Sequence, residues 1–149
     1  MYLSKRDWVS CYTISLTGGK GTSIIFAYKF TWEGSLKPRE YARKAVDVAS
    51  EKQASDILLL DIRKVSGFAD YFVVMSTENH RQMYALAESL VDTFKEAGAS
   101  LHHREGSMNS GWILLDFGEV ILHLFYKEVR EHYQLEKLWS TGKTVLRVQ

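Results

Sequence analysis

The sequence predicts an α/β fold in which helices pack on a mixed sheet of about five strands. Five short segments are rich in branched and aromatic residues and lie between turn-forming residues, which is the pattern of β-strands. Three longer segments repeat their apolar residues with the 3.6-residue period of an amphipathic helix. Because the two kinds of segment alternate along the chain, we expect the helices to cover the faces of a single sheet.

The first predicted helix spans about residues 38–52. It begins at Pro38, the only proline of the chain, and proline suits a first helical turn because its missing N–H would have no partner there. Glu40 adds a carboxylate near the positive end of the helix dipole. Apolar side chains then recur at helical spacing: Tyr41, Ala42, Ala45, Val46 and Ala49.

The chain is expected to divide just before this helix, near Lys37. Residues 1–36 form an N-terminal appendage in this interpretation, either a weak hairpin with arms at residues 9–16 and 23–31 or a disordered segment. Two such arms cannot build a core alone. The remaining elements lie within residues 37–149, which we expect to form one domain.

Two predicted strands and a long helix follow. Residues 56–62 and 70–76 are rich in strand-forming residues. Asn79 is a suitable N-cap for the helix, and Gly98 is a suitable stop after it. Between these two positions the apolar residues form one continuous helical stripe: Met83, Leu86, Ala87, Leu90, Val91 and Phe94.

The remaining predicted elements are a short strand at residues 101–104, a hairpin with arms at residues 112–117 and 120–126, and a last helix at about 128–139. If Gly118 and Glu119 form a two-residue turn, the facing residues of the hairpin can be paired. One face is then wholly apolar and should meet the helices, because it pairs Phe117 with Val120, Leu115 with Leu122, and Ile113 with Leu124.

The other face of the hairpin combines aromatic and polar side chains. It pairs Trp112 with Phe125, Leu114 with His123, and Asp116 with Ile121. Tryptophan is a typical anchor of binding hot spots, so this composition favours a surface that binds a partner protein. In the alternative interpretation, Trp112 and Phe125 lie beneath the N-terminal segment or a helix of the same chain, and Asp116 pairs with His123 at the rim.

Composition excludes several classes of protein. The 149 residues carry 19 Lys and Arg against 18 Asp and Glu, and residues 37–149 carry 15 against 16. No general charge therefore drives binding to nucleic acid or to an anionic membrane. The single cysteine, Cys11, excludes an internal disulfide and suits a reduced cytoplasmic protein. No apolar run approaches the ~18 residues needed to span a bilayer.

Motifs that would indicate an enzyme, a cofactor or a metal are weak. Residues 18–23 resemble a phosphate-binding loop, but Gly21 separates Lys20 from the hydroxyl residue that should follow it directly. The paired carboxylates that hold magnesium for nucleotidyl transfer usually lie two positions apart on a strand. No acidic residue of this chain has another acidic residue two positions further on. His102 and His103 would point to opposite faces of a strand. The sequence thus predicts no catalytic group, no cofactor and no metal site.

Several segments, taken together and in order, resemble the Iojap family, the ribosomal silencing factors. The resemblance covers about residues 37–140. Its segments are residues 56–62, 70–74, 81–82, 105–106, 111–118, 120–125, Arg130 and residues 133–139.

The resemblance implies a domain over residues 37–149 similar to the nucleotidyltransferase fold but without its catalytic acids. It also implies a function that is not enzymatic. In this family the protein binds the large ribosomal subunit through that subunit's fourteenth protein, blocks joining of the small subunit and represses translation. Neither membrane binding nor sequence-specific binding of nucleic acid is expected, and the sequence leaves open whether the free protein is a homodimer.

The resemblance also implies where the partner docks, on the aromatic side of the hairpin. Trp112 would be the anchor, and polar contacts would come from Asp116, His123, Tyr133 and Lys137. Arg81 would order the turn that enters the long helix or contact the partner, the alternative being an exposed position at the helix start. For Tyr133 and Trp139, packing of the last helix against the core is an equal alternative.

Two other functions stay open at this stage. A nucleotidyltransferase-like enzyme would bind nucleotide or show magnesium-dependent turnover, and the missing acid pair speaks against it. An RNA-binding module would need a clustered basic face, whereas the basic residues here are scattered along the chain.

Overall fold

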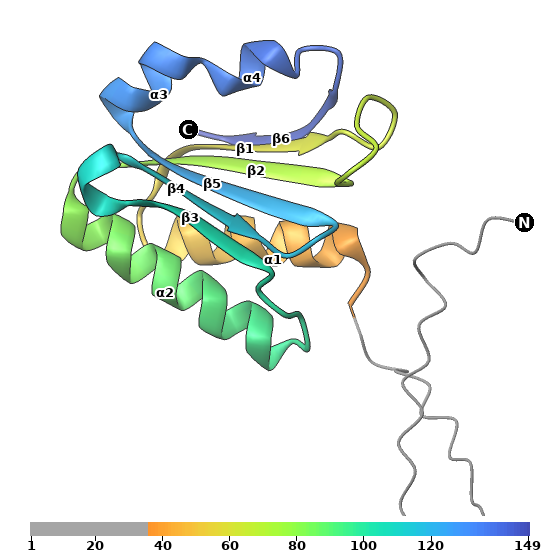
Figure 1. Cartoon of the computed structure of the whole chain (residues 1–149), viewed down its shortest axis with the longest axis horizontal. Coiled ribbons are helices and arrows are strands. Elements are labelled where there is room, and N and C mark those ends of the chain that lie inside the picture. The colour runs from red at the N-terminus through yellow and green to blue at the C-terminus, as the bar shows by residue number, and fades with distance from the viewer. Residues whose placement is uncertain (1–35) are drawn as a thin grey trace, which may run out of the picture. The chain divides into compact units, whose positions relative to one another are not determined.

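The computed structural model describes residues 36–149, which form a six-stranded mixed sheet with helices on both faces (Figure 1). The predicted α/β class is confirmed. The expectations for the N-terminal appendage lie outside the described residues, apart from Leu36, which packs against the core. The elements are α1 (Pro38–Glu51), β1 (Ser55–Asp61), β2 (Tyr71–Thr77), α2 (His80–Glu96), β3 (His103–Ser107), the 3-10 turn η1 (Met108–Ser110), β4 (Trp112–Asp116), β5 (Val120–Tyr126), α3 (Lys127–Tyr133), α4 (Leu135–Leu138) and β6 (Lys143–Val148).

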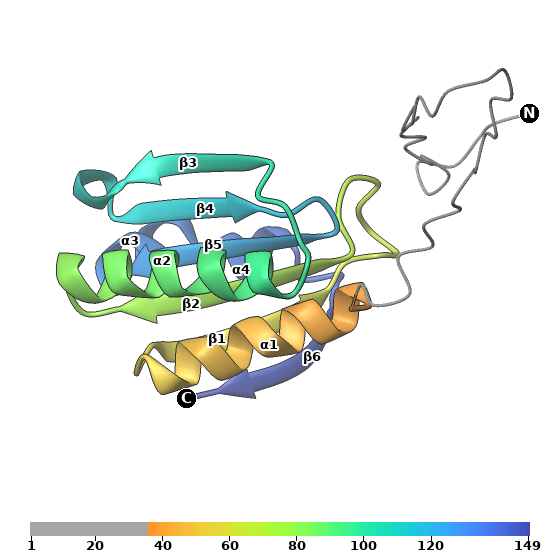
Figure 2. The same cartoon turned by 90° about the horizontal axis from the view of Figure 1, so that it is seen from below.

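The strands lie in the order β3-β4-β5-β2-β1-β6, which Figure 2 shows from the side of α1 and α2. Strands β2 and β5 pair in parallel, and the other neighbours in this sheet are antiparallel. The sixth strand, β6, was not predicted. It lies at the edge of the sheet beside β1 and leaves most of its side chains exposed, so its sequence lacks the apolar alternation of a half-buried strand.

Two predicted boundaries are wrong. The strand expected at residues 101–104 is β3, at residues 103–107, and all five of its residues are exposed. Its position is therefore set by pairing with β4 rather than by an apolar pattern. The single last helix is in fact two, because Gln134 adopts a left-handed backbone with φ +48° between α3 and α4. That conformation ends one helix and redirects the next.

Helices α1 and α2 cover one face of the sheet and form the larger core with it (Figures 1 and 2). Pro38 lies in the first turn of α1. The Asn79 side chain accepts the N–H of Gln82 at 2.9 Å, which confirms the predicted N-cap of α2. The apolar face of the hairpin joins this core as predicted, through Ile113, Leu115, Val120, Leu122 and Leu124. No helix within residues 36–149 is long and apolar enough to cross a membrane.

The hairpin has the predicted register, and its turn is fixed by its own side chain. Trp112 faces Phe125, Leu114 faces His123, and Asp116 faces Ile121. The carboxylate of Asp116 accepts the N–H of Gly118 at 2.7 Å. Gly118 has φ +86°, a left-handed conformation that favours glycine.

Helices α3 and α4 pack on the opposite face of the sheet, over β1, β2 and β5 (Figure 1). They enclose a second, smaller core that includes Phe72, Val74 and Phe125, and Val129, Leu135 and Trp139 pack against it. Phe125 is fully buried there. A helix of the same chain therefore covers much of the aromatic face, as the alternative interpretation of the hairpin held, while Trp112 at the border of this core stays partly exposed.

Candidate docking site

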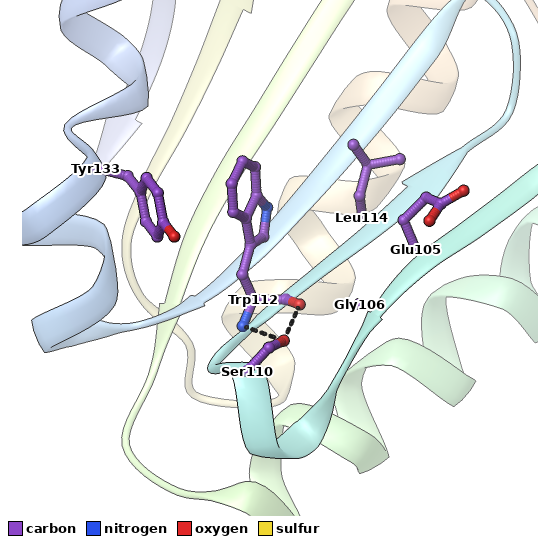
Figure 3. Close-up of a pocket in the computed structure, with 6 residues that line it drawn as sticks. All are labelled: Glu105, Gly106, Ser110, Trp112, Leu114 and Tyr133. Atoms are coloured by element: carbon purple, nitrogen blue, oxygen red, sulfur yellow. Dashed lines mark hydrogen bonds between the residues drawn. The ribbon is translucent and has the colours of Figure 1, made fainter.

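An apolar cavity of about 300 Å³ lies where β3, β4 and α3 meet. Figure 3 shows the Trp112 ring between Tyr133, from α3, and Leu114, from β4. This space is referred to below as the Trp112 cavity, and its lining residues are Glu105, Gly106, Ser110, Trp112, Leu114 and Tyr133. Tyr133 is 53% exposed, so part of this wall faces solvent.

Trp112 is held by contacts on several sides. Its ring stacks on that of Phe125, with centroids 4.8 Å apart. The indole N–H donates to Nδ1 of His123 at 3.4 Å, and the Tyr133 ring centroid lies 5.2 Å away. At the backbone, the Ser110 hydroxyl lies 2.9 Å from the carbonyl oxygen of Trp112 (Figure 3). A side chain fixed in this way loses little conformational entropy when a partner covers it.

His123 lies inside the protein, not at the expected partner surface. Its exposed fraction is 3%, and burial lowers its pKa to about 3, so the ring is neutral at physiological pH. Since Nδ1 accepts the Trp112 N–H, the proton of the neutral ring is on Nε2, which has no hydrogen-bond partner among the described residues. His123 therefore holds the Trp112 ring through this hydrogen bond. Because its side chain is buried, it does not offer the partner the direct polar contact that was expected.

The other predicted site residues lie apart from the cavity. Asp116 is at the far end of β4, where its carboxylate holds the hairpin turn. Lys137 is exposed on α4 and lines a different cavity. Arg81 is exposed in the first turn of α2, on the opposite face of the sheet from α3. Of the six predicted residues, Trp112, His123 and Tyr133 are brought together.

A second, polar cavity of about 540 Å³ contains a buried arginine that the sequence interpretation did not single out as a site residue. The Arg130 side chain is 5% exposed. It donates to the backbone carbonyl of Asp56, to the Ser76 hydroxyl at 2.9 Å and to the Glu136 carboxylate at 3.0 Å. These contacts join α3 to β1, β2 and α4. Because Tyr133 follows one turn after Arg130, the same contacts fix the helix that carries the cavity wall.

Sequence reasoning missed most of the cavity lining. Glu105, Gly106, Ser110 and Leu114 were not named as site residues, although Leu114 was placed on the aromatic face of the hairpin, and Glu105 and Gly106 stand within the family resemblance. Pairing β3 with β4 could have identified Glu105, because this pairing places Glu105 opposite Leu114. Gly106 is required there because a Cβ would lie 2.0 Å from the Trp112 carbonyl oxygen.

The lining of the Trp112 cavity offers little chemistry for catalysis. Its polar side chains include one carboxylate, one phenol and one serine hydroxyl. That hydroxyl is hydrogen-bonded to the backbone carbonyl oxygens of Ser107 and Trp112. Within residues 36–149, no three His, Cys, Asp or Glu side chains converge in a way that could hold a metal ion. What the arrangement provides is a shaped apolar surface with a rigid aromatic wall.

The family model described as ribosomal silencing factor during starvation matches residues 35–149, which include every residue that the structure describes. The chain belongs to the ribosomal silencing factor family. The family named from the sequence resemblance is thus confirmed, and the Trp112 cavity is a feature of a ribosomal silencing factor.

Known relatives agree with this assignment. The ribosomal silencing factor RsfS of Bacillus subtilis is 38% identical over 105 residues, which cover 70% of this chain and 89% of that protein. A mouse protein named for mitochondrial assembly of the ribosomal large subunit is 32% identical over 98 residues, 64% of this chain and 43% of its own length. The match to the crystal structure of a Chromobacterium violaceum protein has a TM-score of 0.68 and 30% sequence identity. This match covers 70% of this chain and 88% of the other.

Proposed function

We propose that this ribosomal silencing factor binds the large ribosomal subunit through its fourteenth protein. The bound protein then blocks joining of the small subunit and represses translation in the cytoplasm. The observation that supports this proposal is the Trp112 cavity in a chain of this family. The name of the mouse relative, which refers to the large ribosomal subunit, supports the choice of subunit.

The cavity suits docking of a protein because of how its aromatic residues are arranged. Trp112 is partly exposed and held rigidly, and Tyr133 extends beside it with half of its surface in solvent. Tryptophan and tyrosine in a preformed pocket are the residue types that dominate the binding energy of protein interfaces. The surface acts by binding alone in this proposal, because covalent catalysis needs a nucleophile beside a base, and the aliphatic hydroxyl of the lining, on Ser110, is hydrogen-bonded to backbone carbonyls.

The predicted residues have different parts in the docking surface. Trp112 and Tyr133 contact the partner directly, and His123 acts through Trp112. Asp116, Lys137 and Arg81 lie outside the cavity, so their contacts, where the partner reaches them, belong to the polar rim. Rim contacts contribute less to affinity than buried anchors do.

The test is co-sedimentation of the purified protein with separated ribosomal subunits, followed by a subunit-joining assay. The protein should sediment with large subunits and not with small ones, and joining should fall as the protein concentration rises. Pull-down by the isolated fourteenth protein after ribonuclease treatment would separate docking on protein from docking on RNA. Equal sedimentation with small subunits, or normal joining at saturating protein, would refute the proposal. The molar mass of the free protein in solution decides between a monomer and a homodimer.

A further inference from the structure

Among the described residues, Glu105 is the one charged side chain in the lining of the Trp112 cavity. It lies on β3 directly opposite Leu114, and Figure 3 shows both side chains at the same side of the Trp112 ring. Its carboxylate is exposed and makes no hydrogen bond or ion pair with any of residues 36–149. A carboxylate beside apolar walls, without a cation of its own chain, can receive one from a partner.

The nearest cation in sequence cannot serve this carboxylate. Arg104 precedes Glu105, so its side chain points to the other face of the sheet, where it pairs with Glu88 of α2 at 2.7 Å. No lysine or arginine of residues 36–149 lines the cavity. Glu105 thus gives the rim of an apolar cavity a local negative charge, although residues 37–149 as a whole are nearly balanced, with 15 basic and 16 acidic residues.

The size of the cavity indicates what enters it. A volume of about 300 Å³ is at the lower end of the range of small-molecule sites, which is roughly 300–1,000 Å³. The walls are mainly the Trp112, Leu114 and Tyr133 side chains, with few polar groups to orient a cofactor. One large apolar side chain on a protein surface fits this space and this chemistry better than a polar metabolite does.

From these observations we infer that the Trp112 cavity recognises a pair of partner side chains: an apolar one that enters the cavity, and a lysine or arginine beside it that pairs with Glu105. This inference rests on the proposed function, since it specifies the docking surface on the ribosomal protein. The apolar contact supplies most of the affinity. The ion pair fixes orientation and speeds association, as charges at the rim of an interface generally do.

The test compares two neutralised carboxylates. Glu105→Gln removes the charge at the cavity, and Glu51→Gln removes an exposed charge at the last residue of α1, which packs on the opposite face of the sheet from α3 and α4. Both variants change the net charge equally and keep the side-chain length. Affinity for purified large subunits is measured at several salt concentrations, together with the melting temperature of each variant.

Glu105→Gln is expected to bind on the order of 5-fold more weakly than the wild type, with a shallower dependence on salt, and Glu105→Lys should bind at least roughly 10-fold more weakly. Glu51→Gln should match the wild type in both respects. Equal affinities of Glu105→Gln and Glu51→Gln would overturn the inference and leave the proposed function in place, because wild-type binding is measured in the same series. Failure of the wild type to bind large subunits would overturn both.

Discussion

Tyr133→Ala should weaken docking while leaving the fold nearly unchanged. Tyr133 is the most exposed aromatic wall of the Trp112 cavity, with 53% of its surface in solvent in the free protein. Its ring packs against two others, that of Trp112 at 5.2 Å between centroids and that of His132 beside it in the chain. The substitution therefore removes surface that a partner would cover without opening the core.

The expected loss of affinity follows from the area involved. A tyrosine at an interface buries roughly 150–250 Å², and about half of that is still open here, so docking covers about 100 Å² more. At about 25 cal/mol per Å² this area contributes about 2.5 kcal/mol, which corresponds to roughly 60-fold in affinity. The free energy of unfolding should fall by about 1 kcal/mol or less, because Tyr133 stabilises the free protein mainly through its partly exposed packing on Trp112.

Tyr84→Ala is the matched control. Tyr84 is 48% exposed on α2, which packs on the other face of the sheet. Both variants should show similar small shifts of the urea midpoint, but only Tyr133→Ala should lose affinity for large subunits. Unchanged binding by Tyr133→Ala, or the same loss in both variants, would remove the cavity from the docking surface.

Three further predictions concern the rest of the site. Trp112→Ala should lower the free energy of unfolding by about 2 kcal/mol, because the side chain is partly buried on Phe125. The same substitution should weaken docking at least about 30-fold. A normal urea midpoint would show that the stacking on Phe125 contributes nothing to stability. His123 binds its proton with a pKa of about 3 in the folded state and about 6.5 in the unfolded chain. Its contribution to stability is therefore complete above pH 6.5 and declines as the pH falls toward 3, by about 3 kcal/mol at pH 4.5; melting curves of His123→Asn should lose this part of the acid sensitivity. Deletion of residues 1–35 should leave the melting temperature and docking unchanged, and a large fall in melting temperature would show that this segment contributes to the fold.

Local patterns in the sequence predicted the parts of the fold that depend on local spacing. The stripe from Met83 to Phe94 defined α2, and the Gly118-Glu119 turn fixed the hairpin register and hence which residues share a face with Trp112. These features follow from the periods of helices and strands and from turn chemistry, which act over a few residues.

The packing of α3 and α4 over the aromatic face of the hairpin could not be predicted in the same way. The sequence around Gln134 continues a helical pattern, and nothing local shows that its backbone turns left-handed and lets α4 pack on the second core. His123 is buried on the same face, among the rings of Phe72, Trp112 and Phe125. The role of Arg130 depends on Asp56 and Ser76, which are 74 and 54 residues away, so its contacts are a property of the assembled chain.

The strands of the sheet differ greatly in burial, and this difference sets how fast their amide hydrogens exchange with solvent. Every residue of β2 is buried and the strand has neighbours on both sides, so its amides should exchange only when the whole domain unfolds. Every residue of β3 is exposed at the edge of the sheet, so this strand should open at much lower free energy. A partner seated in the cavity beside Glu105 would slow exchange along β3 and leave exchange along β6, the mostly exposed strand at the other edge of the sheet, unchanged, which marks the bound surface without any substitution.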